Sequence, residues 1–320
     1  MSDKEKSILL FVIFITISLV YFFTNTNDIN NFIIRNRIIK FISLLLVGYC
    51  VAISSTLFQT ISNNRIITPS IMGFDSLYIF IQSFIVLVVT NLGDINQYYL
   101  EFIISSIAIM SILSRKLYNI VSSISRKTIY LLLLTGVVIN LLFKSMGNLL
   151  ISLMDINKFN LLQQKMYTNF DNMITSSIPI GILVITLCSF IIYNIYNQLD
   201  LVLIGRNNAK MLGIDIKNLE SAIIGIVSAL VCVSTILVGP VIFLGLFVVN
   251  ISYEIMEYCN HKNMFIFSIL ISWIALVFSS IITDRIFEFT MTVNVVLDFI
   301  GGIYFIGLLL RRNKKYDFNN

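Results

Sequence analysis

The stretch SAIIGIVSALVCVSTILVGPVIFLGLFVVNISY, residues 221–253, contains no charged side chain. A helix that crosses a membrane needs about 20 apolar residues, and as few as about 17, so this run of 33 residues is close to the length of two short crossings. Gly239 and Pro240 interrupt it. Because proline lacks an N–H and disfavours helix in the residue before it, we expect two helices joined by a tight non-helical piece. Non-helical backbone at membrane depth must be buried in protein or line a cavity.

The composition extends this interpretation to the whole chain of 320 residues. Hydrophobic residues make up 57% and charged residues 12%, whereas soluble proteins carry about 25% charged residues. Repeated continuous apolar runs predict an all-α, polytopic membrane protein, because a membrane barrel shows alternating segments of about ten residues. We expect one transmembrane domain, 1–320, in the cell membrane. Its ten predicted spans are 7–24, 41–59, 72–91, 98–114, 128–147, 176–196, 220–238, 242–257, 264–283 and 293–310.

The distribution of Lys and Arg predicts the orientation of these spans. With the N-terminus in the cytoplasm, fifteen of the 22 basic residues fall on the inner side. Cytoplasmic loops of membrane proteins are enriched in basic residues, so both termini are expected inside. Arg35, Arg37 and Lys40 cluster on the outer side against this rule. Either they snorkel to lipid headgroups, or they form a basic patch for an acidic external partner.

A polar segment, GRNNAKMLGIDIKN at residues 205–218, separates the uncharged runs 172–199 and 221–253. The charge distribution places it in the cytoplasm. It mixes helix formers with two glycines, so it is either a passive connector or a docking surface for a soluble partner. In the last span, Asp298 is an ionisable group that either faces the interior of the bundle or is hydrated near the outer interface. Gly301 and Gly302 permit close helix contact there.

Several kinds of chemistry find no support in the sequence. No GxxxxGK[ST] phosphate loop is present, so ATP is not hydrolysed by this chain. The single histidine, His261, is expected to be a solvated loop residue and not a ligand. The four cysteines are isolated and are expected to be buried apolar residues. We therefore expect no catalytic residue, no cofactor and no bound metal. The remaining function classes are a channel, a scaffold, and the membrane half of a transporter that is powered by another chain.

The chain resembles the permeases of iron-chelate and cobalamin ABC importers, a type II family with ten spans. GYCVAISSTLFQTISNNRIITPSIMGFDSLY, residues 48–78, is similar to the family signature through Gln59, Asn64, Pro69 and Gly73. VGPVIFLGL at 238–246 and FIGGIYF at 299–305 are similar to two later motifs. The matches occur in order and cover nearly the whole chain. The family continues the second motif with a Pro-His pair, where this chain has Val249-Asn250, so no role of that pair carries over.

The resemblance implies that two permease chains surround a path and that two ATPase subunits dock on the cytoplasmic loop. An external binding protein would deliver the substrate. Gly205, Ala209, Leu212 and Gly213 match the family loop that forms the coupling helices. On this basis we expect the ATPase contact at the following residues of the loop: Ala209, Met211, Leu212 and Ile214, ringed by Arg206, Lys210 and Asp215, with Gly205 and Gly213 ending short helices.

Two further sites follow from the same resemblance. Arg35, Arg37 and Arg285 are expected to meet the binding protein. The path is expected along the fifth and tenth spans, with these candidates: Thr135, Gly136, Asn140, Asn294 and Asp298.

The segments 64–78 and 154–163 are most similar to the branch for catechol-type siderophores such as petrobactin. The sequence also allows a permease of the same family that imports haem or cobalamin. It does not distinguish a homodimer from a heterodimer. A self-powered secondary carrier and a membrane scaffold or sensor are the alternatives from other classes.

Overall fold

A computed structural model describes residues 2–23, 31–89, 99–124, 129–166, 170, 177–257, 260–288 and 290–317. Within its helices, the side chains of 31–33, 89, 99–100, 102, 120–124, 129–133, 161, 164–166, 206, 308–309 and 311–317 are outside that description. All regular structure in the described ranges is helical, as the sequence predicts.

Each of the ten expected spans corresponds to one helix of 12 residues or more, and two shorter helices, of 11 and 6 residues, lie in the longest connectors. The helices are α1 (Asp3–Phe23), α2 (Asn31–Ser62), α3 (Phe74–Val89), α4 (Tyr99–Ile124), α5 (Ile129–Ser152), α6 (Ile156–Met166), α7 (Ile178–Leu203), α8 (Arg206–Met211), α9 (Ile216–Val238), α10 (Leu244–Ile255), α11 (His261–Arg285) and α12 (Val293–Asp317).

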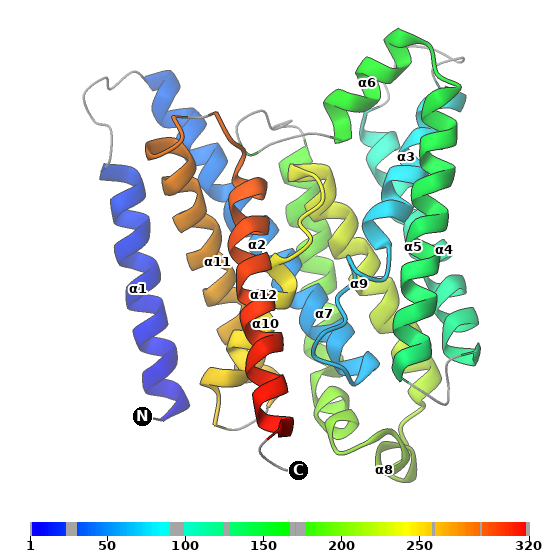
Figure 1. Cartoon of the computed structure of the whole chain (residues 1–320), viewed down its shortest axis with the longest axis vertical. Coiled ribbons are helices and arrows are strands. Elements are labelled where there is room, and N and C mark those ends of the chain that lie inside the picture. The colour runs from blue at the N-terminus through cyan, green and yellow to red at the C-terminus, as the bar shows by residue number, and fades with distance from the viewer. Residues whose placement is uncertain are drawn as a thin grey trace.

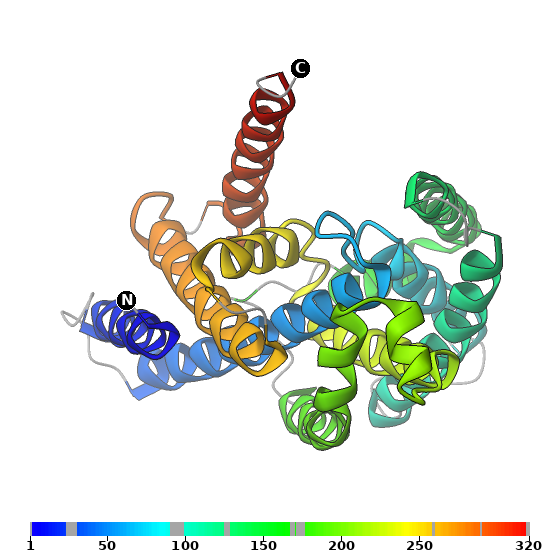
Figure 2. The ribbon, with the colours of Figure 1, turned by 90° about the horizontal axis from the view of Figure 1, so that it is seen from below.

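The long helices stand side by side, with α6 at one end of the molecule and α8 at the other (Figure 1). Seen from below, α1 lies at one edge, α4 and α5 lie at the opposite edge, and α12 projects from one face (Figure 2). The two central helices are α2 and α9, whose most apolar windows are 72% and 78% buried, against 6% for α1. Since lipid covers apolar side chains as well as protein does, the exposed face of α1 is suited to the bilayer.

Six helices in the described residues are long and apolar enough to cross a membrane: α1, α2, α5, α7, α9 and α11. Shorter apolar helices lie in α3, α10 and α12. The remaining long helix, α4, continues to Ile124, although the sequence placed its end before Arg115. The guanidinium of Arg115 lies against Gly225 of α9, where an added Cβ would come within 2.6 Å of its Nε. Packing on α9 thus keeps this arginine inside the helix.

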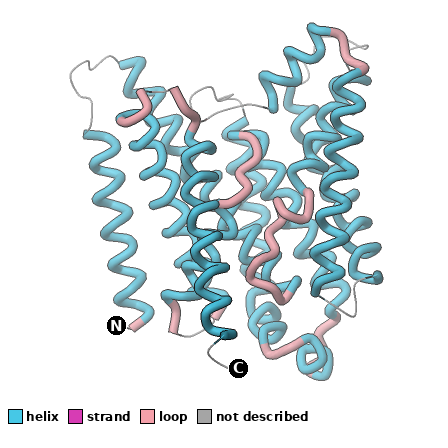
Figure 3. Tube along the Cα trace, viewed as in Figure 1, coloured by secondary structure: helices cyan, strands magenta, loops and turns pink. Residues whose placement is uncertain are grey.

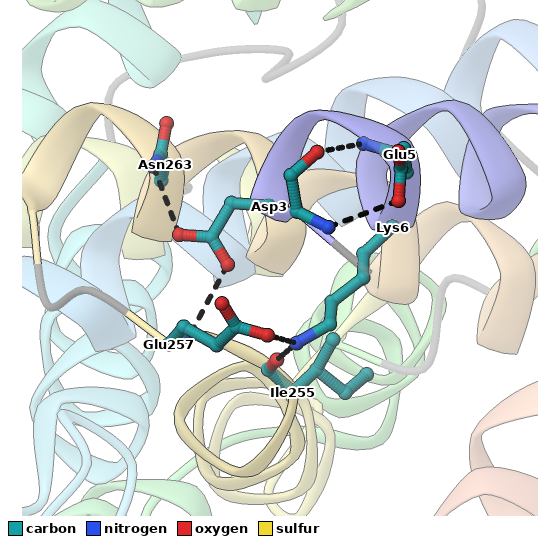
Figure 4. Close-up of polar contacts among 7 residues, drawn as sticks. Asp3, Glu5, Lys6, Ile255, Glu257 and Asn263 are labelled. Carbon is teal, nitrogen blue, oxygen red and sulfur yellow. Dashed lines mark hydrogen bonds and ion pairs between the residues drawn. The ribbon is translucent and has the colours of Figure 1, made fainter.

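The first turn of α1 is held to the turn between α10 and α11 by polar contacts (Figure 4). Lys6 Nζ donates to Ile255 O at 3.0 Å and to Glu257 Oε1 at 2.8 Å. Asp3 Oδ1 accepts from Glu257 N at 3.1 Å, and its Oδ2 accepts from Asn263 Nδ2 at 3.5 Å. The lysine therefore binds a carbonyl at the C-terminal end of α10, where a cation is favoured.

Two loop segments lie inside the helical layer and not at its ends (Figure 3). One spans 63–73 and joins α2 to α3, and the other spans 239–243 and joins α9 to α10. The second is the break that Gly239 and Pro240 predict. We call them the first and the second break.

Candidate coupling loop and helix breaks

The segment after α7 turns twice before α9 begins, and a glycine stands at each turn. Gly205 has a φ of 112° and Gly213 a φ of 87°, values that residues with a Cβ rarely adopt. After α8, Gly213 N donates to Lys210 O at 3.1 Å and Ile214 N donates to Ala209 O at 3.2 Å. This pair of bonds is a Schellman motif, so Gly213 ends the short helix α8 as expected. Gly205 instead follows the 26-residue α7 and is the N-cap of α8.

Asp215 begins the next helix. Its Oδ1 accepts from Lys217 N at 3.2 Å and from Asn218 N at 3.3 Å, which makes it the N-cap of α9. A carboxylate is favoured at this position because the N-terminus of a helix carries partial positive charge. The predicted role of Asp215 at the edge of a contact stays a prediction, and its capping role is an addition.

The exposed surface of this loop is apolar at its tip. Met211 is 86% exposed and Leu212 61% exposed, and Lys210 beside them is exposed. Ala209 is fully buried, and Ile214 packs against the core. The side chain of Arg206 lies outside the described residues. Of the four apolar residues predicted to dock, the structure therefore presents Met211 and Leu212, and turns Ala209 and Ile214 inward.

The second break is capped by two side chains of α12, one helical turn apart. Asn294 Nδ2 donates to Val238 O at 3.1 Å, and Asp298 Oδ1 accepts from Phe243 N at 3.4 Å. The first bond satisfies a carbonyl at the end of α9, and the second an N–H at the start of α10. Backbone groups freed by a break at membrane depth need such partners. Gly301 permits the close approach, since an added Cβ would lie 2.6 Å from Phe243 Cβ.

The first break contacts the second and is held by α10. Ser70 Oγ donates to Val241 O at 3.5 Å. Asn250 Nδ2 donates to Arg65 O at 2.9 Å, and the guanidinium of Arg65 lies 4.2 Å from the centre of the Tyr253 ring. Asn250, at the position where the sequence departs from the family pattern, thus connects α10 to the turn after α2.

Helix α5 borders the first break on its other side. Gly73, with a φ of 86°, packs against Asn140, where an added Cβ would lie 2.8 Å from Asn140 Cα. Asn140 Oδ1 accepts a hydrogen bond from Ser76 Oγ. Gly136 leaves room for the sulfur of Met72. Four of the five predicted path residues therefore contact the breaks or their flanking turns, from two helices distant in sequence, while Thr135 is half-buried beside them.

The basic residues predicted to lie on the outer side divide into two kinds. Lys40 is buried and pairs with Asp284 at 2.8 Å, which ties α2 to α11. Arg35 and Arg285 are exposed, and Arg37 is half-buried. Arg285 also lies in the last turn of α11, where a positive charge interacts favourably with the partial negative charge of the C-terminal carbonyls. Of the three arginines predicted to meet the binding protein, Arg35 and Arg285 are therefore accessible, and Arg37 is partly so.

The expectation for His261 is wrong. Its side chain is fully buried at the start of α11 and contacts Asp200 and Thr60. A histidine beside Lys262 in a short loop is usually hydrated, and no local pattern shows that the ends of α2 and α7 cover it. Cys50, Cys188 and Cys232 are buried with free thiols, as expected, and Cys259 lies outside the described residues.

The chain is similar to known membrane permeases over nearly its whole length. The model of the FecCD transport family matches residues 7–311. The petrobactin import system permease protein YclO of Bacillus subtilis (strain 168) is 38% identical over 293 residues, which are 90% of this chain and 92% of that protein. The petrobactin import system permease protein FatC of Bacillus anthracis is 26% identical over 280 residues, 88% of this chain and 79% of that protein.

Among solved structures, a metal-chelate type ABC transporter in an inward-facing conformation shares the fold. The TM-score is 0.79 at 17% identity, and the match covers 97% of this chain and 99% of that chain. This match confirms the expected fold of a type II ABC importer permease.

The apolar helices and the relatives together identify the chain as a multi-pass membrane permease, a transport subunit and not an enzyme. The chain belongs to the FecCD transport family, because the family model covers almost all of its residues.

Proposed function

We propose that this chain is the permease subunit of an ATP-binding-cassette importer that moves a ferric siderophore across the cytoplasmic membrane. The observation that carries the proposal is the 38% identity to a petrobactin import permease over 90% of the chain. The geometry supports it, because the residues expected on the path gather at the two breaks. Residues 1–320 act as a single transmembrane domain.

The energy for transport arrives from a separate chain through α8. Two ATPase subunits dock on the cytoplasmic side, and Met211 and Leu212 form the apolar centre of each contact, with Lys210 at its edge. The charge distribution supports this orientation. The first residues of α1, the last turns of α12 and helix α8 lie at one end of the molecule (Figure 1), so both termini are cytoplasmic as well.

The path lies between this chain and a second permease chain, identical or related. The long face of α12 offers apolar side chains to that space: Phe299 is 70% exposed, Ile303 56% and Ile306 60%. A ferric siderophore is large and often anionic, so a smooth and weakly binding path suits it better than a tight site. Asn294 and Asp298 hold the shape of the second break beside this path.

At the outer end, an extracytoplasmic binding protein delivers the chelate. Arg35, Arg37 and Arg285 pair with carboxylates on that protein. Charges at the rim of an interface act mainly on the rate of encounter and its salt dependence.

The test is reconstitution of the chain in liposomes with its second permease chain, the ATPase and the binding protein. We expect uptake of radioactive iron as ferric petrobactin to require ATP and to continue with the proton and sodium gradients dissipated. Uptake by this chain alone, driven by an ion gradient, would show a secondary carrier. Uptake of haem or cobalamin but not of ferric petrobactin would contradict the substrate class, and no uptake at all would favour a scaffold.

A further inference from the structure

A buried imidazole joins the ends of three helices on the side of the molecule where α8 lies. His261 is the first residue of α11, and its side chain is 0% exposed. Its two ring nitrogens contact residues from two other helices, Asp200 near the end of α7 and Thr60 near the end of α2. A buried polar ring with both nitrogens partnered holds its neighbours in fixed positions.

The contact with α7 is short and double. One oxygen of Asp200, Oδ1, lies 2.6 Å from His261 Nδ1 and accepts from His261 N at 2.9 Å. The second bond satisfies a free N–H at the start of α11, where negative charge is favoured. Asp200 stands in the last turn of α7, and Gly205 and α8 follow directly. A displacement of α8 therefore acts on α11 through this carboxylate.

The contact with α2 leads toward the breaks. His261 Nε2 lies 2.9 Å from Thr60 Oγ1, and Thr60 is two residues before the end of α2. The first break follows at once. From there Ser70 reaches Val241 O in the second break. Named contacts thus run from the end of α7, through the imidazole, to both breaks.

We propose that His261 is a positioning residue of the transport cycle, which transmits movement of α8 through Asp200 and Thr60 to the two helix breaks. This inference rests on the proposed function, since it takes α8 as the site where the ATPase acts. It assigns a role to a residue that touches neither the ATPase surface nor the path. A chain of contacts is a pathway only if its members are energetically coupled, so the coupling itself is what must be measured.

Two variants divide the contacts of the ring. The amide of His261→Asn has its nitrogen near the position of Nδ1 and can keep the bond to Asp200, but it does not reach Thr60. The amide of His261→Gln can reach Thr60 but not Asp200, which then keeps only its bond from the backbone N–H of residue 261. Both variants, with Asp200→Asn, Thr60→Val and the double variant His261→Asn with Thr60→Val, are reconstituted in the complete complex. ATP hydrolysis and ferric petrobactin uptake are measured separately.

We expect His261→Asn and His261→Gln each to lower the number of chelates moved per ATP by about tenfold. ATP hydrolysis and complex assembly should stay close to the native values. The double variant should move as many chelates per ATP as His261→Asn does, because both lack the contact between residue 261 and Thr60. The control is Trp273→Phe. It removes another hydrogen bond between α11 and α2, from Trp273 Nε1 to Leu45 O at 2.9 Å. The number of chelates moved per ATP should be unchanged in this variant.

Native transport per ATP in His261→Asn, His261→Gln and Thr60→Val would overturn the inference, and so would an equal loss in Trp273→Phe. If the histidine variants do not assemble, Thr60→Val decides, because it keeps the shape of the side chain and removes only the hydroxyl. The native complex separates this inference from the proposed function. If the native complex shows no ATP-driven uptake, the proposed function fails. If it transports normally and the variants do so too, only the role of His261 fails.

Discussion

The coupling loop and the second break are both short interruptions of helix, but they are built in opposite ways. In the loop, Gly205 and Gly213 turn the chain, and Asp215, which lies ten residues after Gly205 and two after Gly213, caps the next helix. In the second break, Gly239 turns the chain, but the caps come from α12, more than fifty residues later, with separations of 56 and 55. The loop is organised by its own residues and the break by another helix.

The different origin of the caps follows from what surrounds each region, water at the loop and lipid and protein at the second break. At the end of the molecule, water satisfies any backbone group that the loop leaves free, so the loop can expose Met211 and Leu212. At membrane depth no water is at hand, and an unpaired group costs several kcal/mol at roughly the scale of hydrocarbon transfer. The break therefore needs side chains from a neighbouring helix, and its shape depends on where that helix stands. The following predictions test this division, from the largest expected effect to the smallest.

Leu212→Asp should abolish coupling without unfolding the protein. Because Leu212 is 61% exposed, a charge there costs little in the isolated chain but is unfavourable against an apolar cleft. We expect binding to the ATPase to weaken by about a hundredfold or more, measured by pull-down and by uptake. Asn207→Asp, the same charge on an exposed neighbour, is the control and should bind nearly as the native chain does. If Leu212→Asp binds the ATPase as well as the native chain does, α8 is not part of the ATPase contact.

Asp298→Ala should destabilise the whole bundle, because it leaves Phe243 N without its acceptor. The expected loss is about 1–3 kcal/mol in the free energy of unfolding, measured by denaturation in detergent. Asp298→Asn keeps an acceptor oxygen and should recover most of the loss. Asn294→Ala removes the bond to Val238 O and should cost about 1 kcal/mol. If Asp298→Ala is as stable as the native protein, the break does not depend on α12.

Gly213→Ala should affect only the loop. No atom lies within 4 Å of an added Cβ there, and φ is 87°, so the cost is backbone strain of about 1–2 kcal/mol. We expect faster amide hydrogen exchange in α8 and an unchanged midpoint of global unfolding. Gly301→Ala is the counterpart at the break, where the added Cβ meets Phe243, and it should lower the global midpoint. The reverse pattern would show that the loop is not self-contained.

Arg35→Glu combined with Arg285→Glu should have the smallest effect, since both side chains are exposed and belong to neither region. We expect the association rate with the binding protein to fall by about threefold to tenfold and to depend less on salt, measured by surface plasmon resonance. Lys4→Glu, a charge reversal at the opposite end, is the control. An unchanged rate and salt dependence would mean that these arginines serve only as membrane anchors.

The sequence predicted what depends on local pattern. Hydropathy located a helix at each of the ten expected spans, Gly239 and Pro240 located the second break, and Gly213 located the end of α8. The fold and the class of transporter also followed from motifs that recur in order. These features are set by residues close together in the chain, so one sequence is enough to find them.

What the sequence missed depends on packing between distant helices. His261 has the neighbours of a solvated residue, and only the arrival of Asp200 and Thr60 buries it. Asn250 attracted notice as a departure from a motif, but its bond to Arg65 O needs the fold. Ala209 and Ile214 look as available for docking as Met211 and Leu212, since helical spacing alone does not tell which of them the turn at Gly213 directs inward.

The contacts at the start of α1 also bear on how the protein is made. Lys6 leaves the ribosome early, but the carbonyl that it binds belongs to Ile255, 249 residues later. At about 5–20 residues per second, synthesis of that interval takes roughly 12–50 s. During this time α1 has no α11 to pack on, and its described ring contacts to an available helix are those with Phe41 of α2. A mean hydropathy of 2.3 is compatible with residence of α1 in lipid during that interval, so α1 is synthesised well before the residues that fix its first turn.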